Sequence, residues 1–226
     1  MSSRTVTIAV EGCAHGELDG IYASLAETEK RTGKKVDLLI CCGDFQAVRN
    51  LVDLHSMACP IKFLSMNSFY KYYSGEKKAP VLTLFVGGNH EASNHLQEIY
   101  HGGWVAPNIY YLGGSGVVNF GGIRIAGISG IYKSGDYRKG IYERIPYDRG
   151  SIRSVFHTRE VDTFKLAQVS GPIDVFISHD WPRGVTRFGD ERSLLRRKPF
   201  FREEVHFRAC RQPSPARVMI CTSLCA

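Results

Sequence analysis

The sequence contains no apolar run that approaches the roughly 18 consecutive residues of a membrane-spanning helix. Its first residues hold a short apolar stretch without a small-residue cleavage site, which predicts a strand and not a signal peptide. None of its seven cysteines belongs to a Cys-x-x-Cys pair, which argues against a structural zinc site. We therefore expect a soluble intracellular protein whose cysteines form no disulfide framework.

Positive charge is what the chain has in excess, with a formal net charge of +7 over 226 residues. Such an excess favours anionic partners, and nucleic acid first among them. Until the charges are located, a merely basic surface explains the value equally well. The length allows one large domain or two small ones.

Four short apolar runs predict strands that are buried on both faces. They cover residues 5–12, 36–43, 80–88 and 172–178. Helical patterns follow the first three runs, and a further helix predicted over 159–171 precedes the fourth. This alternation of strands and helices predicts an α/β layered fold.

Each predicted strand is followed by side chains of the kind that bind metals. They are Cys13 and His15, then Asp44, then Asn89, and finally His179. Ligands of open α/β sheets bind at the carboxyl ends of the strands, so these side chains are expected to meet in one crevice. A single His or Asp at a strand end is more commonly a cap or a hydrogen-bonded surface group, but the set in this order favours a metal site.

Ordered along the chain, these motifs resemble the calcineurin-like metallophosphoesterase superfamily. The motifs are Cys13-Ala14-His15, Gly43-Asp44, Gly88-Asn89-His90-Glu91 and the later His179, of which Gly-Asn-His-Glu is the most specific. The resemblance implies a β-sheet sandwich flanked by helices. It covers a catalytic domain at 1–205 and leaves 206–226 as a divergent tail outside the family fold.

One residue narrows the resemblance, because the superfamily normally has Asp-x-His where this sequence has Cys13-Ala14-His15. A cysteine in that place is similar to the branch of the superfamily that debranches RNA lariats, as are residues 41–50, 72–98, 102–113 and 178–183. The resemblance implies hydrolysis of the 2′-5′ phosphodiester bond in branched intron RNA, within mRNA processing in the nucleus. We expect a monomer without a membrane partner.

The resemblance also implies roles for the motif residues. Asp44 would bridge two divalent metal ions, with Cys13 and His15 completing the first site and Asn89 and His179 the second. Zn, Fe or Mn suits these mixed ligands, and the thiolate favours Zn or Fe. The alternative that Cys13 is a buried spectator beside a working second site stays open.

His90 is the candidate general acid for the departing 2′-oxygen, since an unperturbed imidazole pKa of about 6.5 suits proton transfer near neutral pH. Glu91 is expected to orient a neighbouring group and not to bind metal. His95 is expected at the surface.

Residues 132–159 combine seven Lys or Arg with three Asp or Glu, and their tyrosines recur every five residues, which fits neither a helix nor a strand. We expect a long loop that contacts RNA, because cations meet phosphates and tyrosine rings stack on bases; the resembled branch has a recognition loop in this region. The alternative is a solvated basic loop. Candidate RNA-binding residues are Tyr132, Lys133, Tyr137, Arg138 and Lys139, together with Arg49 after the Gly-Asp turn.

The sequence departs from the superfamily pattern in having no His-x-His pair, which normally gives one ligand to each metal. We expect weaker metal binding and weak or absent activity, with a sheet edge left uncovered. A generic phosphomonoesterase is a second enzymatic alternative. A non-catalytic binding protein on the same fold is the alternative from another class.

Overall fold

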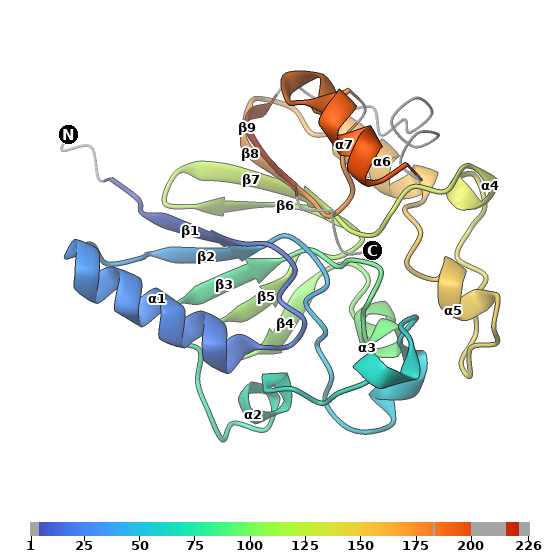
Figure 1. The fold of residues 1–226 in the computed structure, drawn as a ribbon, viewed down its shortest axis with the longest axis horizontal. Coiled ribbons are helices and arrows are strands. Elements are labelled where there is room, and N and C mark those ends of the chain that lie inside the picture. The colour runs from blue at the N-terminus through green and yellow to red at the C-terminus, as the bar shows by residue number, and fades with distance from the viewer. Residues whose placement is uncertain (1–4, 183, 200–215, 222–226) are drawn as a thin grey trace.

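The computed structural model describes residues 5–182, 184–199 and 216–221. Two sheets pack against each other, with α1 below the first sheet and α6 above the second in Figure 1. The expected α/β architecture of a metallophosphoesterase-like sandwich flanked by helices is therefore confirmed. None of the described helices is long and apolar enough to cross a membrane.

The first sheet contains the first three predicted strands. Its strand order is β1-β2-β3-β5-β4, with β1, β2, β3 and β5 parallel and β4 antiparallel to β5. The strands are β1 (Ile8–Glu11), β2 (Leu38–Cys41), β3 (Leu82–Phe85), β4 (Gly103–Ala106) and β5 (Ile109–Tyr111). Because β1, β2 and β3 run in parallel, the loops that follow them lie at the same edge.

The second sheet contains the fourth predicted strand, in the order β6-β7-β8-β9. Its strands are β6 (Ser115–Phe120), β7 (Ile123–Ile128), β8 (Ile173–Ser178) and β9 (Ala216–Cys221). Because β8 belongs to this second sheet, His179 reaches the site from the sheet opposite to the one that carries Cys13, His15 and Asp44. Strands β7, β8 and β9 are parallel to one another, whereas β6 pairs antiparallel with β7.

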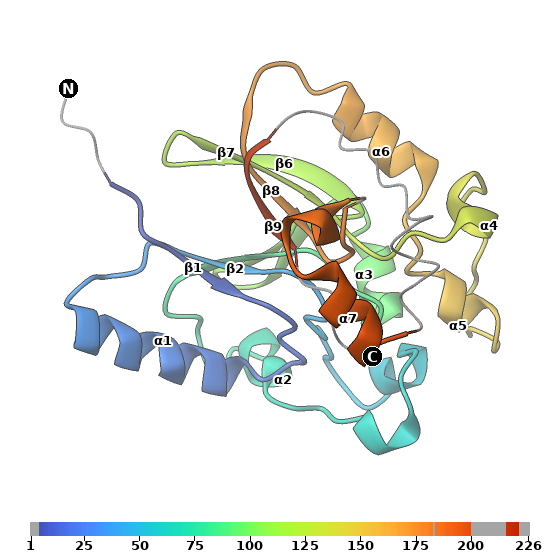
Figure 2. The same ribbon diagram turned by 45° about the horizontal axis from the view of Figure 1, so that its top comes forward.

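Strand β9 lies in the tail for which no periodicity predicted a strand. It pairs with β8 from Ile173↔Ala216 to Ser178↔Cys221, so the edge of β8 expected to be uncovered is paired over these residues. Figure 2 shows β9 beside β8. The domain boundary at 205 stays a prediction. Positions 200–215 and 222–226, which include His206, lie outside the described residues.

Ten helical segments occur among the described residues. The α-helices are α1 (Leu18–Thr32), α2 (Phe69–Tyr73), α3 (Ser93–Glu98), α4 (Ser134–Tyr137), α5 (Ser151–Ser154), α6 (Glu160–Ala167) and α7 (Glu191–Arg197), and the 3₁₀ turns are Asp53–Ser56, Ile61–Phe63 and Val185–Phe188. Helix α1 ends where Gly33 adopts a left-handed conformation with φ 67°.

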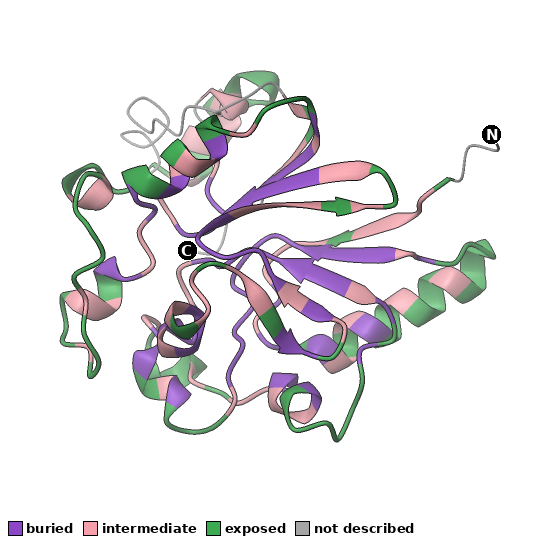
Figure 3. Cartoon of the chain, turned by 180° about the vertical axis from the view of Figure 1, so that it is seen from behind, coloured by how far each residue is buried: buried purple, intermediate pink, exposed green. Residues whose placement is uncertain are grey.

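Buried side chains form three layers of core between these elements. Leu18 and Tyr22 of α1 pack below the first sheet, and Leu166 of α6 packs above the second. Between the sheets, residues such as Ile40 and Ile177 are fully buried. Figure 3 shows this buried interior and the exposed outer face of α1. Strands β2, β3 and β8 are mostly buried, which explains why they read as continuous apolar runs, whereas Val10 of β1 is 47% exposed.

Candidate metal centre and active site

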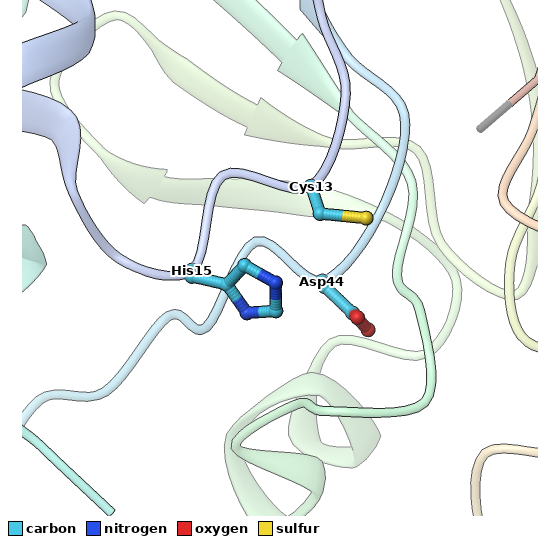
Figure 4. Close-up of side chains that lie close together, drawn as sticks. All are labelled: Cys13, His15 and Asp44. Carbon is cyan, nitrogen blue, oxygen red and sulfur yellow. The ribbon is translucent and has the colours of Figure 1, made fainter. Parts of the chain in front are cut away.

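Cys13, His15 and Asp44 bring their ligand atoms within 4.8 Å of one another. Cys13 and His15 follow β1, and Asp44 follows β2, so two parallel strand ends supply the cluster. Figure 4 shows the three side chains entering the same space from two loops. Thiolate, imidazole and carboxylate are all metal ligands, and the cluster was predicted from where the strands end.

The backbone around these ligands adopts an unusual conformation. His15 has φ 46° and Asp44 has φ 42°, which lie in the left-handed region that non-glycine residues seldom occupy. Hydrogen bonds between the loops hold them there, with the amide N–H of His15 donating to the Asp44 carbonyl at 2.6 Å. Such conformations cost free energy and cluster at functional sites.

Two motif glycines are required because ligands lie against their backbone. A Cβ atom on Gly43 would lie 2.2 Å from His179 Nδ1, and one on Gly88 would lie 2.2 Å from Asp44 Oδ1. The close approach of a ligand therefore requires glycine at both positions, and at Gly43 the φ of 117° adds a second reason.

Asp44 lies at the centre of the site and is completely buried. Its Oδ1 accepts the amide N–H of His90 at 2.8 Å and lies 3.5 Å from His179 Nε2. Burial raises the pKa of the Asp44 carboxyl, but the contact of this carboxylate with the His90 imidazole, together with the nearby His179, outweighs burial and holds that pKa below its usual value. The contact between the His90 imidazole and the Asp44 carboxylate raises the pKa of His90.

The second carboxylate oxygen of Asp44 bears on whether these residues fit the metal ions that the motifs imply. Oδ2 is buried and accepts no hydrogen bond of good geometry from the described residues, although His90 Nδ1 lies 3.2 Å away. A buried carboxylate oxygen without a partner is costly. A metal ion would satisfy it, so the donor set fits the divalent ions that the motifs imply.

His179 and Asn89 form the other side of the site, as expected. The ring Nδ1 of His179 lies 3.1 Å from the carbonyl oxygen of Cys42, which can only accept, so Nδ1 carries a proton. In the neutral ring, Nε2 therefore presents a lone pair toward Asn89 Oδ1, 3.1 Å away. Two lone-pair atoms that face each other beside a carboxylate suit a shared cation.

Glu91 joins the loop after β2 to the loop after β3. Its carboxylate accepts the amide N–H groups of Phe45, Gln46 and Gly88, each at 2.8 Å. Burial raises the pKa of Glu91 to about 8, and the Asp44 charge adds to that shift. These contacts agree with an orienting role for Glu91.

The chain also matches a known protein family. The model of the calcineurin-like phosphoesterase family matches residues 6–208. The chain belongs to the calcineurin-like phosphoesterase family. Its crevice at the sheet edge, with Asp44 in the middle, is therefore the candidate active site of a phosphoesterase.

Curated relatives of this family member carry a more specific name. The chain is 57% identical over 213 residues to lariat debranching enzyme A of Xenopus laevis, covering 94% of this chain and 40% of the relative. It is 59% identical over 212 residues to the lariat debranching enzyme of Homo sapiens, covering 94% and 39%. The enzyme of Arabidopsis thaliana is 56% identical over 198 residues, covering 88% and 47%. The chain thus spans less than half the length of these relatives.

Two residues near the phosphoesterase crevice carry roles that sequence reasoning missed. Gln46 is buried, and its amide lies 2.8 Å from His15 Nδ1, which orients the imidazole ring. His95 is buried at 5% exposure, so its predicted surface location is wrong. Its Nδ1 lies 2.9 Å from the Ala47 carbonyl and steadies the loop after β2, and burial lowers the pKa of His95.

The basic loop at 132–159 contains α4 and α5 and is otherwise irregular. Lys133, Arg138 and Lys139 are exposed, whereas Tyr132 and Tyr137 are half-buried with ring centroids 5.4 Å apart. The Tyr137 hydroxyl lies 2.5 Å from Thr163 Oγ1. The exposed cations remain candidates for phosphate contact, and the tyrosines partly fit the alternative of packing against the domain.

Arg49 lies in a different environment from the one predicted. Its guanidinium donates to Asp53 at 3.0 Å and to Glu98 at 2.8 Å, and its side chain is 15% exposed. These carboxylates occupy the donors that a phosphate would need. The structure therefore favours a role for Arg49 in fixing the loop after β2, and contact with RNA stays a prediction.

Proposed function

We propose that this chain hydrolyses the 2′-5′ phosphodiester bond at the branch point of RNA lariats with the help of divalent metal ions. The buried Asp44 carries the proposal, because one of its oxygens has no hydrogen-bond partner among the described residues and metal-type ligands lie on either side of it. Relatives at 56–61% identity that are named lariat debranching enzymes support the choice of substrate.

The residues divide into two ligand groups around Asp44. Cys13 and His15 would complete one metal site with it, and Asn89 and His179 the other. A bound divalent ion supplies charge neutralisation of the phosphate and an acidified water near neutral pH. The thiolate of Cys13 favours Zn or Fe over Mn.

His90 is positioned to donate a proton to the leaving 2′-oxygen. Its side chain is 23% exposed, whereas the Asp44 carboxylate beside it has no exposed surface. Of this pair, only His90 can meet a group that enters from solvent. The Asp44 carboxylate accepts the backbone N–H of His90 and lies 3.2 Å from the ring, which holds the imidazole at the edge of the crevice.

Cleavage of a synthetic 2′-5′ branched RNA by the purified chain tests the proposal. We expect metal-dependent release of linear product, with the matched 3′-5′ linear RNA uncleaved and a chromogenic phosphomonoester hydrolysed poorly. Because the sequence lacks a His-x-His pair, we expect slow turnover. No cleavage in Zn, Fe or Mn, with branched RNA still bound, would instead support the non-catalytic alternative.

The ligand role of Cys13 needs its own comparison. Cys13→Ser and Cys13→Asp should change the metal that the chain retains, measured by mass spectrometry, because they replace a soft thiolate by hard oxygen donors. Equal metal content in all three proteins would make Cys13 a spectator. A fluorescent fusion would test the proposed nuclear location.

A further inference from the structure

Arg159, the residue before α6, is among the largest fully buried side chains of the described chain, at 2% exposure. Its guanidinium donates to the Asp136 carbonyl at 2.9 Å, to the Ser154 carbonyl at 3.0 Å and to Glu143 Oε1 at 2.5 Å. These acceptors lie in α4, in α5 and in the segment between them. One buried side chain therefore ties three separate points of the basic loop together. Figure 1 shows α4 and α5, the two helices of this loop.

The two terminal nitrogens of the Arg159 guanidinium make these contacts, whereas its Nε is buried without a hydrogen-bond partner among the described residues. A planar guanidinium offers five donors in a fixed arrangement, whereas a lysine ammonium is a point charge on a flexible stem. Glu143 supplies the opposite charge, with a side chain that is 0% exposed. Removing either partner would leave a buried charge uncompensated.

A second set of contacts closes the same loop at its base. His157 Nδ1 lies 2.7 Å from Asp136 Oδ2, and the Thr158 amide donates to the Ile131 carbonyl at 3.0 Å. The Arg159–Glu143 pair is neutral as a unit and hidden from solvent. The net positive charge of the loop therefore rests on its other residues, and Lys133, Arg138, Arg144, Arg149 and Arg153 are exposed.

We propose that the buried Arg159–Glu143 pair is a positioning device that holds the basic loop in one conformation, so that its exposed cations and Tyr142 meet the RNA strands flanking the branch point. Tyr142 is 50% exposed, which leaves ring surface for a base. A preorganised loop pays less ordering entropy when it binds. This inference rests on the proposed function, and it makes Arg159 a positioning residue that does not touch RNA.

The experiment uses the full chain with Arg159→Met, Arg159→Lys and Glu143→Gln. Glu160→Gln is the matched control for RNA binding, since Glu160 is exposed in the same region and lies outside the pair. Arg153→Met is a control for hydrogen exchange alone, because Arg153 is one of the exposed cations proposed to meet RNA. Hydrogen exchange of the amides in 133–158 reports loop order without any RNA. Binding of a non-cleavable branched RNA and hydrolysis of bis(p-nitrophenyl) phosphate separate recognition from chemistry, and melting temperatures identify any variant that fails to fold.

The direction in which Glu143→Gln changes RNA affinity decides between two explanations. Charge alone predicts tighter RNA binding after loss of an acidic group, whereas loss of the positioning pair predicts binding about tenfold weaker. We expect Glu160→Gln to bind like the wild type, and we expect the three pair variants to exchange faster across the loop while cleaving the small phosphodiester within about twofold of wild type.

Two results would overturn the inference: unchanged exchange in all three pair variants, or RNA binding by Glu143→Gln at least as tight as by Glu160→Gln. Failure of the proposed function has a different signature, in which the wild-type chain itself does not prefer branched over linear RNA. In that case hydrogen exchange still decides whether Arg159 holds the loop. Arg159→Lys and Glu143→Gln keep nearly the same side-chain volume, so they serve if Arg159→Met does not fold.

Discussion

The metal centre is held by backbone, whereas the basic loop is held by side chains. Around Asp44, left-handed residues, close glycines and backbone amides fix the ligands within a buried sheet edge. In the loop, short helices are tied together by the pairs Arg159–Glu143 and His157–Asp136. The proposed chemistry thus rests on the rigid region, and the proposed RNA recognition rests on a surface segment whose order depends on few contacts.

The largest effect should come from Asp44→Asn, which removes the carboxylate shared by both proposed metal sites. We expect metal affinity to fall on the order of 100-fold or more, since even changes behind the ligands cost 10–100-fold. Metal retained after dialysis measures it. Asp37→Asn is the control, because Asp37 lies just before the other end of β2. Similar losses in both variants would contradict a central role for Asp44.

Gly88→Ala should have the next largest effect. The new Cβ would lie 2.2 Å from Asp44 Oδ1 and 2.4 Å from the Asp44 amide nitrogen, so the loop must shift. We expect the free energy of unfolding to fall by about 1–3 kcal/mol, as measured by urea denaturation. Gly140→Ala in the basic loop meets nothing within 4 Å and should be nearly neutral. An equal fall in the free energy of unfolding in both variants would contradict the proposed difference between the site around Asp44 and the basic loop.

Replacing Lys133 and Arg138 by Ala should weaken RNA binding without affecting stability. Both side chains are exposed. If each meets one phosphate of single-stranded RNA, the slope of log affinity against log salt should decrease by about 1.4 in magnitude. Binding titrations at several salt concentrations test this. Lys34 and Lys35, just beyond the end of α1, are the control pair, and an equal change there would indicate nonspecific attraction.

The smallest effect should come from Asp53→Asn, which removes a side-chain ion pair near the metal centre. Burial raises the pKa of Asp53, but its hydrogen bonds with Arg49 and Asn94 outweigh burial and lower it. Because the pKa of Asp53 is lowered in the folded state, its carboxylate stabilises the protein at any pH above the unfolded-state pKa of about 3.9. This stabilisation is lost as the pH falls through the folded-state pKa.

The stability difference between wild type and Asp53→Asn should therefore be constant from about pH 5 to 8 and shrink below about pH 4. Circular dichroism of denaturant unfolding at each pH measures it. A difference that grows in acid would contradict the assigned direction.

The difference between local patterns and distant contacts explains which parts of the fold could be predicted from the sequence. Strands β2, β3 and β8 were predictable because burial on both faces leaves a continuous apolar run, and β1 has a similar run although Val10 is 47% exposed. Ligands follow each of these strands within a few residues, and parallel pairing places three of the ligand groups at one edge. The other strands of the second sheet, β6, β7 and β9, gave no such local signal.

Contacts between residues far apart in the sequence could not be predicted from the sequence. Arg49 follows the Gly-Asp turn and pairs with Asp53 four residues on, but its other partner, Glu98, is 49 residues away, so that ion pair had no sequence signal. His95 was predicted at the surface of a helix, and nothing in the sequence indicated its contact with the carbonyl of Ala47, 48 residues away. Arg159 counted as one more cation of the loop, although its burial removes it from the surface.

Glu91 has a genetic consequence. Because its carboxylate binds amides of two separate loops, a change in the Gly-Asp motif alters the support of the Gly-Asn-His-Glu motif. Substitutions in the two motifs should therefore show strong epistasis, with double variants departing from the sum of the single effects. The two motifs therefore act as one structural unit, in which the effect of a substitution in one motif depends on the residues of the other.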